Sequence, residues 1–255
     1  MMPLPRRCLS PALLALLLLF APAAQAGKAL VAVAANFKTT AEVLAADFEA
    51  ASGHELVLIS GSTGKLFTQI SNGAPFDVFL AADALRPLKV AQAGGSVLPP
   101  KTYASGRLGI WIRGAQPDAS MPPTDRLITL RRVALANPKL APYGAAAIEV
   151  IAELGIEPEL RDRLAFGENV AQAYALIAAG AAEGGLIAWS LLMDGGRLAE
   201  SWPVPTDWHS PIDQDAVLLN HGAGNPAAQG FFEYLDSPAA REVIRARGYV
   251  LPEAG

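Results

Sequence analysis

Two hydroxyl side chains, Ser62 and Thr63, stand between glycines in the stretch SGSTGKL, directly after a short apolar run. A phosphate-binding loop would need glycine at position 59 and a hydroxyl at position 66, but the chain has Ile59 and Leu66 there. A nucleophile elbow, Gly-x-Ser-x-Gly, also fails because Ser62 follows Gly61 directly. What remains is a strand-to-helix corner whose small polar residues can cap the helix or bind a ligand.

Three further corners of this kind occur along the chain. Asn36 follows the apolar run ALVAVAA, Tyr143 stands in APYG at the start of a helical pattern, and Val170 follows GEN after another strand. Ligands of open α/β sheets bind outside the carboxyl ends of the strands. Helix N-termini there offer free N–H groups and about half a positive charge each, which suits anions. Four such corners predict a site of uncharged donors for a small, fully ionised oxyanion.

The elements that must position these corners alternate between strand and helix. The first eighty residues or so read strand-helix-strand-helix-strand, which predicts a parallel sheet with right-handed crossovers. A second unit of the same kind begins near Arg107, and the C-terminal tail shows two amphipathic helices and a terminal strand. We therefore predict an α/β fold of two lobes, the second inserted into the first, with residues 27–105 and 216–255 in lobe 1 and 106–215 in lobe 2.

The first 26 residues have the pattern of a signal peptide. Arg6 and Arg7 precede the apolar run PALLALLLLFAPA, and AQA ending at Ala26 is a small-x-small cleavage pattern. The one cysteine, Cys8, lies before that run, so the mature chain has none. The net charge of −4 argues against nucleic acid and anionic lipid as partners. We expect an exported, periplasmic protein without a membrane span in its mature part.

Other candidate residues give weaker indications. His209 lies near Asp207, Asp213 and Asp215, but the spacing matches no zinc or calcium motif, so a surface loop is expected. Glu168 is expected to point away from an anion and to cap a helix. The chain also lacks a cysteine nucleophile, a credible serine elbow and paired corner carboxylates, so we do not expect an enzyme.

Four segments in order, VAVAANF, SGSTGKLFTQISNGAPFDVFLAAD, ANPKLAPYG and FGENVAQA, resemble the molybdate-binding periplasmic proteins of ABC transporters. The resemblance covers nearly the whole mature chain. It implies the two-lobed type II periplasmic binding protein fold, with a ligand cleft between the lobes. Many members have serine at the first corner, where this chain has Asn36, and the second serine of their G-S-S-G-K-L motif usually stands where it has Thr63.

The resemblance also implies a ligand, its contacts and partners. The ligand is molybdate or tungstate, held by neutral hydrogen bonds, with no cofactor and with molybdenum present only in the bound oxyanion. The binding groups implied are the side chain of Asn36, the hydroxyl and amide of Thr63, the hydroxyl of Tyr143 and the backbone amide of Val170, with Ala35 and Ser62 as further candidates. A monomer would deliver the ion to a membrane permease and its ATPase. The alternatives are another tetrahedral oxyanion, or an exported enzyme using the same cleft.

Overall fold

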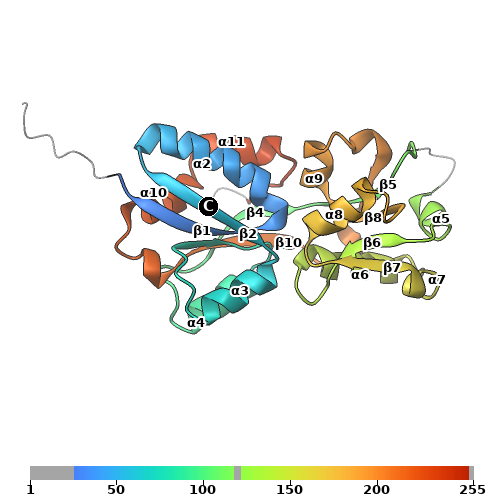
Figure 1. Ribbon diagram of the computed structural model, residues 1–255, viewed down its shortest axis with the longest axis horizontal. Coiled ribbons are helices and arrows are strands. Elements are labelled where there is room, and N and C mark those ends of the chain that lie inside the picture. The colour runs from blue at the N-terminus through green and yellow to red at the C-terminus, as the bar shows by residue number, and fades with distance from the viewer. Residues whose placement is uncertain (1–25, 118–121, 253–255) are drawn as a thin grey trace, which may run out of the picture.

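The computed structural model describes residues 26–117 and 122–252, which form two lobes side by side (Figure 1). Residues 1–25, almost the whole of the expected signal peptide, lie outside this range. Across the described residues, no helix combines the length and apolarity needed to cross a membrane. Each lobe contains one five-stranded sheet.

The sheet of lobe 1 has the strand order β2-β1-β3-β10-β4. Its central strand β1 pairs in parallel with β2 and β3, whereas β10 is antiparallel to β3 and β4. The bounds are β1 Lys28–Ala34, β2 Glu55–Gly61, β3 Val78–Leu80, β4 Lys101–Gly106 and β10 Ile212–Leu218. The parallel core follows from the predicted strand-helix alternation, and β10 is the strand with which the chain returns to lobe 1.

Helices cover both faces of this sheet (Figure 1). Side chains of β1 alternate between the two faces, so Val31 and Val33 join one apolar cluster and Ala32 joins the other. The first cluster is covered by α2 (Lys38–Ser52), α10 (Pro226–Tyr234) and α11 (Pro238–Ala246), and the second by α3 (Thr63–Ser71) and α4 (Leu85–Gln92). This burial on both faces fixes where each strand ends and hence where the corners lie.

The sheet of lobe 2 has the order β7-β6-β8-β5-β9, with β6 parallel to β7 and β8. Its strands are β5 Leu108–Ile112, β6 Val133–Ala136, β7 Leu164–Gly167, β8 Gly184–Ala188 and β9 Ser201–Pro203. Its helices are α5 Pro123–Leu127, α6 Pro142–Glu153, α7 Glu157–Leu160, α8 Val170–Ala178 and α9 Trp189–Asp194. Short 3-10 turns complete the chain at 35–37, 161–163, 198–200, 206–208 and 220–222.

The lobes are joined by two crossings, and the second lies earlier in the chain than predicted. The first passes through Arg107, between β4 and β5, close to the expected boundary. The expected return at 215/216 is wrong, because β10 lies wholly in the sheet of lobe 1 and pairs with β4 from Ile212 onward. Polar residues in the first half of β10 hid its start in the sequence. The expected terminal strand is reduced to a bridge between Ser105 and Val250.

Candidate functional site

The predicted site residues line one small cavity between the lobes. The space in it that a water-sized molecule can occupy is only about 10 Å³, room for about one water molecule and far below the roughly 300–1,000 Å³ typical of sites for drug-sized ligands. All six sequence candidates belong to its wall: Ala35, Asn36, Ser62, Thr63, Tyr143 and Val170. They come from four strand-to-helix corners, two in each lobe. All residues that line the cavity are uncharged, so its size and polarity suit a small ion held by neutral donors.

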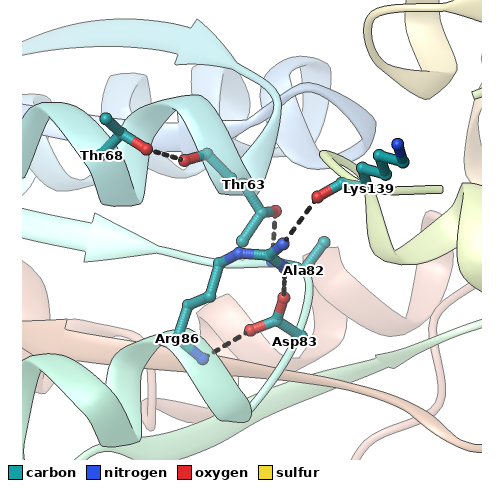
Figure 2. A network of polar contacts seen from close by, with 7 residues as sticks. Thr63, Thr68, Ala82, Asp83, Arg86 and Lys139 are labelled. Atoms are coloured by element: carbon teal, nitrogen blue, oxygen red, sulfur yellow. Dashed lines mark hydrogen bonds and ion pairs between the residues drawn. The ribbon is translucent and has the colours of Figure 1, made fainter. Parts of the chain in front are cut away.

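The corner before α3 supplies two hydroxyl groups. Ser62 occupies the position just before the helix, yet its side chain makes no cap hydrogen bond. Its hydroxyl is buried, and no group in the described part of the chain bonds to it. The Thr63 Oγ1 accepts a hydrogen bond of 3.1 Å from the backbone N–H of Ala82 (Figure 2), so its own hydrogen remains available. Simple helix capping therefore does not explain Ser62, and both hydroxyls can donate to a ligand.

Asn36 lies in a 3-10 turn, Ala35–Phe37, between β1 and α2. Its side-chain amide donates to the Oε1 of Gln214 at 2.9 Å and to the Tyr249 hydroxyl at 3.2 Å. Both amide hydrogens therefore bond to other protein side chains and not into the cavity. This differs from the sequence-based expectation that the Asn36 side chain donates to a ligand. The first N–H groups of a helical turn have no partner within it, so Asn36 and Ala35 have backbone donors to offer instead.

The corners of lobe 2 supply a hydroxyl and an amide. Tyr143 lies in the first turn of α6 and is buried. Burial first, and then the nearby Tyr249, raise the pKa of Tyr143 well above its usual value, so it stays protonated and able to donate. Val170 begins α8, where the Oδ1 of Asn169 caps the helix by accepting from Gln172 N at 3.0 Å. That cap leaves the Val170 N–H without a side-chain acceptor.

Direct contacts across the cleft hold the lobes together. The Gly64 N–H donates to the Leu140 carbonyl at 2.8 Å. Arg86, which is paired with Asp83, reaches the Lys139 carbonyl at 3.3 Å (Figure 2). The two lobes therefore touch beside the cavity through Leu140 and Lys139 of lobe 2, which is a closed arrangement.

An ion pair between Lys65 and Glu168 also crosses the cleft. Glu168 does not line the cavity, but the expectation that it caps a helix is wrong, because its carboxylate pairs with Lys65 and Asn169 caps α8. The same contact means that Lys65 is paired rather than free in solvent. Both side chains are partly exposed, so this pair is a surface contact at the edge of the cavity.

The expected surface loop around His209 is exposed at Asp207, but His209 itself is buried, and Asp213 and Asp215 belong to β10 rather than to the loop. His209 bonds to the Ser210 carbonyl, while Asp213 and Asp215 accept from Ser105 and Thr102. Within residues 26–117 and 122–252, no three His, Cys, Asp or Glu side chains are grouped so that they could hold a metal ion.

Sequence reasoning missed the buried side chains behind the cavity. Gln214, Tyr103 and Tyr249 join Asn36 and Tyr143 in one hydrogen-bond network. Gln214 gave no indication in the sequence, because it stands between Asp213 and Asp215 in a polar run. The tyrosines gave none, because buried tyrosine is common in any core.

A two-lobed α/β chain that closes on a small, uncharged cavity of donors belongs to the class of solute-binding proteins. Residues 29–250 match the family described as bacterial extracellular solute-binding protein, and the chain belongs to this family. It is 43% identical over 236 residues to the molybdate-binding protein ModA of Azotobacter vinelandii, covering 91% of this chain and 94% of that protein.

Two further relatives agree with this. The molybdate-binding protein ModA of Rhodobacter capsulatus is 44% identical over 241 residues, covering 93% of this chain and 94% of the relative. The solved structure of the Azotobacter vinelandii periplasmic molybdate-binding protein superimposes with a TM-score of 0.80 at 35% identity, covering 88% of this chain and 100% of that one. The sequence-based prediction of the family and of the two-lobed fold is thereby confirmed.

Proposed function

We propose that this chain is a periplasmic binding protein that captures molybdate, or tungstate, between its lobes as a monomer. It delivers the ion to the permease and ATPase of an ABC transporter, and it needs no cofactor. The observation that carries the proposal is the meeting of four corners at one uncharged cavity, with the Ser62 hydroxyl buried there and not bonded to any described residue. The names of relatives at 43% and 44% identity support molybdate as the ion.

The donors in the cavity stabilise a dianion without a counter-charge. The hydroxyls of Ser62, Thr63 and Tyr143 and the amides at the helix starts all point hydrogens at the ligand oxygens. Hydrogen bonds to a charged acceptor contribute about 1.5–3 kcal/mol each, and the partial charge of helix N-termini adds to this. Because donors come from both lobes, the ion binds the closed arrangement more tightly than the open one, and this difference drives closure.

Capture rather than catalysis is the role we propose for this cleft. The only side chain of the cavity wall that titrates is Tyr143, and burial keeps it protonated. General acid-base chemistry near neutral pH requires a group whose pKa lies close to that pH. The second candidate ligand is another tetrahedral oxyanion, such as sulfate. Sulfate has the same charge as molybdate, so neutral donors also suit it, but it is smaller and would leave the hydrogen bonds longer.

A thermal-shift panel of molybdate, tungstate, sulfate, phosphate and chromate tests the proposal. A ligand at about 100 times its Kd stabilises the folded protein by about 2.7 kcal/mol, which raises Tm by several degrees in a chain of this size. We expect this shift with molybdate or tungstate and little shift with sulfate at the same concentration. An equal shift with sulfate would contradict the size argument, and turnover of an ester substrate would favour an enzyme.

The ion pair between Lys65 and Glu168 predicts a small effect on closure. Partly exposed ion pairs contribute about 0.2–1 kcal/mol, so Glu168→Gln is expected to weaken molybdate binding about fivefold at most. The loss should vanish at high salt, because salt screens exposed charges. Calorimetric titration at low and high salt measures this. Glu157→Gln, which removes the pair with Arg161 inside lobe 2, is the control, and a large, salt-independent loss in Glu168→Gln would refute the surface role.

A further inference from the structure

Gln214 lies in β10, close to the point where the chain returns from lobe 2 to lobe 1. Its side chain is fully buried. The pairing of β10 with β4 shifts register between Gln214 and Asp215, where β4 has one additional residue as in a β-bulge. Bulges re-aim a side chain and are frequent next to functional sites. The extra residue at this shift is Tyr103 of β4, whose hydroxyl donates to the Gln214 Oε1.

The side chain of Gln214 connects groups of both lobes. Its Oε1 accepts from the Asn36 amide at 2.9 Å and from the Tyr103 hydroxyl at 3.2 Å. Its Nε2 donates to the Tyr143 hydroxyl oxygen at 3.2 Å. Asn36 belongs to lobe 1 and Tyr143 to lobe 2, and both line the cavity. One amide thus contacts two cavity residues on opposite sides of the cleft.

Gly106 makes room for this connection. It lies opposite Ile212 in the pairing of β4 with β10. A Cβ atom at this position would lie 2.1 Å from the Tyr143 hydroxyl oxygen and 2.8 Å from the Gln214 Nε2. Such approaches are far below van der Waals contact, so any other residue would push the two groups apart. The glycine and the hydrogen bond are two separate features that allow the same contact.

The contact determines where the Tyr143 hydrogen points. Because Gln214 donates to the Tyr143 oxygen, the tyrosine keeps its own hydrogen for another acceptor. Tyr143 lines the cavity, so that acceptor is the bound ion. We propose that Gln214 is a positioning residue, which fixes Tyr143 as a donor and thereby makes the cavity specific for fully ionised oxyanions. The inference rests on the proposed function and deepens it.

The same geometry disfavours an oxyanion that carries a proton. Hydrogen phosphate has an O–H group, which needs an acceptor in the site when it is taken out of water. The cavity wall contains no carboxylate to accept from that O–H, so only hydroxyl oxygens, whose hydrogens serve the other ligand oxygens, are left to accept it. A carboxylate in place of the Gln214 amide would accept the Tyr143 hydrogen, and the tyrosine oxygen would then face the cavity as an acceptor. The identity of residue 214 therefore determines which oxyanions the cavity accepts.

The test measures molybdate and phosphate affinities of Gln214→Met and Gln214→Glu by calorimetry between pH 6 and pH 9. We expect Gln214→Met to lose about tenfold in molybdate affinity, as for one weakened bond to a charged group. Gln214→Glu is expected to lose about 100-fold in molybdate affinity at high pH and to regain it at low pH, where the new carboxyl is protonated. It is also expected to lower the ratio of molybdate affinity to phosphate affinity. Ser201→Ala, a buried serine of lobe 2 that bonds to Arg197, is the control and keeps the wild-type values.

Each other outcome has a defined meaning. The positioning role is overturned if both Gln214 variants keep the wild-type molybdate affinity and the wild-type ratio of molybdate to phosphate affinity. It is also overturned if all anions lose affinity equally and at every pH, because such a loss indicates structural damage alone. If both variants fail to fold, Tyr103→Phe replaces them, because it removes a hydrogen bond to the same Gln214 Oε1. It is expected to lower the ratio of molybdate affinity to phosphate affinity, and an unchanged ratio overturns the positioning role of Gln214. A wild-type protein that binds no molybdate instead refutes the proposed function itself.

Discussion

Gly64→Ala is expected to weaken molybdate binding by about 10- to 100-fold while making the ligand-free protein slightly more stable. Gly64 lies in the first turn of α3, and across the cleft its Cβ would lie 2.9 Å from the Leu140 carbonyl oxygen and 3.1 Å from the Leu140 Cα. Overpacking of this kind costs about 1–3 kcal/mol. That cost falls only on the closed arrangement, because Leu140 belongs to the other lobe.

The open arrangement responds in the opposite direction. Alanine is favoured over glycine inside a helix by about 0.5–1 kcal/mol, and Gly64 does not have the positive φ that would forbid alanine. Denaturant unfolding of the ligand-free protein and calorimetric titration with molybdate measure the two effects. Gly224→Ala, where the added Cβ meets nothing within 4 Å, is the control for binding. Wild-type affinity in Gly64→Ala would show that the ion binds without the Gly64–Leu140 contact.

The corner residues could be predicted from the sequence because each corner has a local pattern. A short apolar run ending in small or polar residues, followed by helical spacing, locates the four corners without knowledge of the rest of the chain. The choice of Thr63, Tyr143 and Val170 within them followed from the family resemblance. The sheets follow from the same alternation, since parallel strands need helical crossovers. These predictions depend on neighbours within about ten residues, which sequence patterns describe well.

Contacts between the lobes could not be predicted in this way. Lys65 and Glu168 are 103 positions apart, and Tyr143 and Gln214 are 71 apart. Such pairs depend on how two separately folded lobes lie against each other, and no periodicity encodes that. The direction of the Asn36 amide illustrates the difference: the sequence located the residue at the cavity, but only its distant partners show that its side chain donates elsewhere.

Ser62→Ala is expected to weaken molybdate binding by about 10- to 150-fold, as for the loss of one hydrogen bond to a charged acceptor. The ligand-free protein should keep its stability or gain some. The Ser62 hydroxyl is buried in the closed arrangement without a partner among the described residues, and an unsatisfied buried hydroxyl costs about 1–3 kcal/mol. Removing it therefore relieves a cost in the absence of the ion and removes a contact in its presence.

A serine that caps a helix behaves in the opposite way, and the same chain contains one. The Ser237 hydroxyl accepts from the Ala240 N–H at 3.1 Å at the start of α11. Ser237→Ala should cost about 1 kcal/mol of stability and leave molybdate affinity unchanged, as measured by denaturant unfolding and calorimetry. If Ser62→Ala instead lowers stability by that amount with full affinity, Ser62 is an ordinary cap. Opposite signs in this matched pair would show that the Ser62 hydroxyl is retained for the ion and not for the helix.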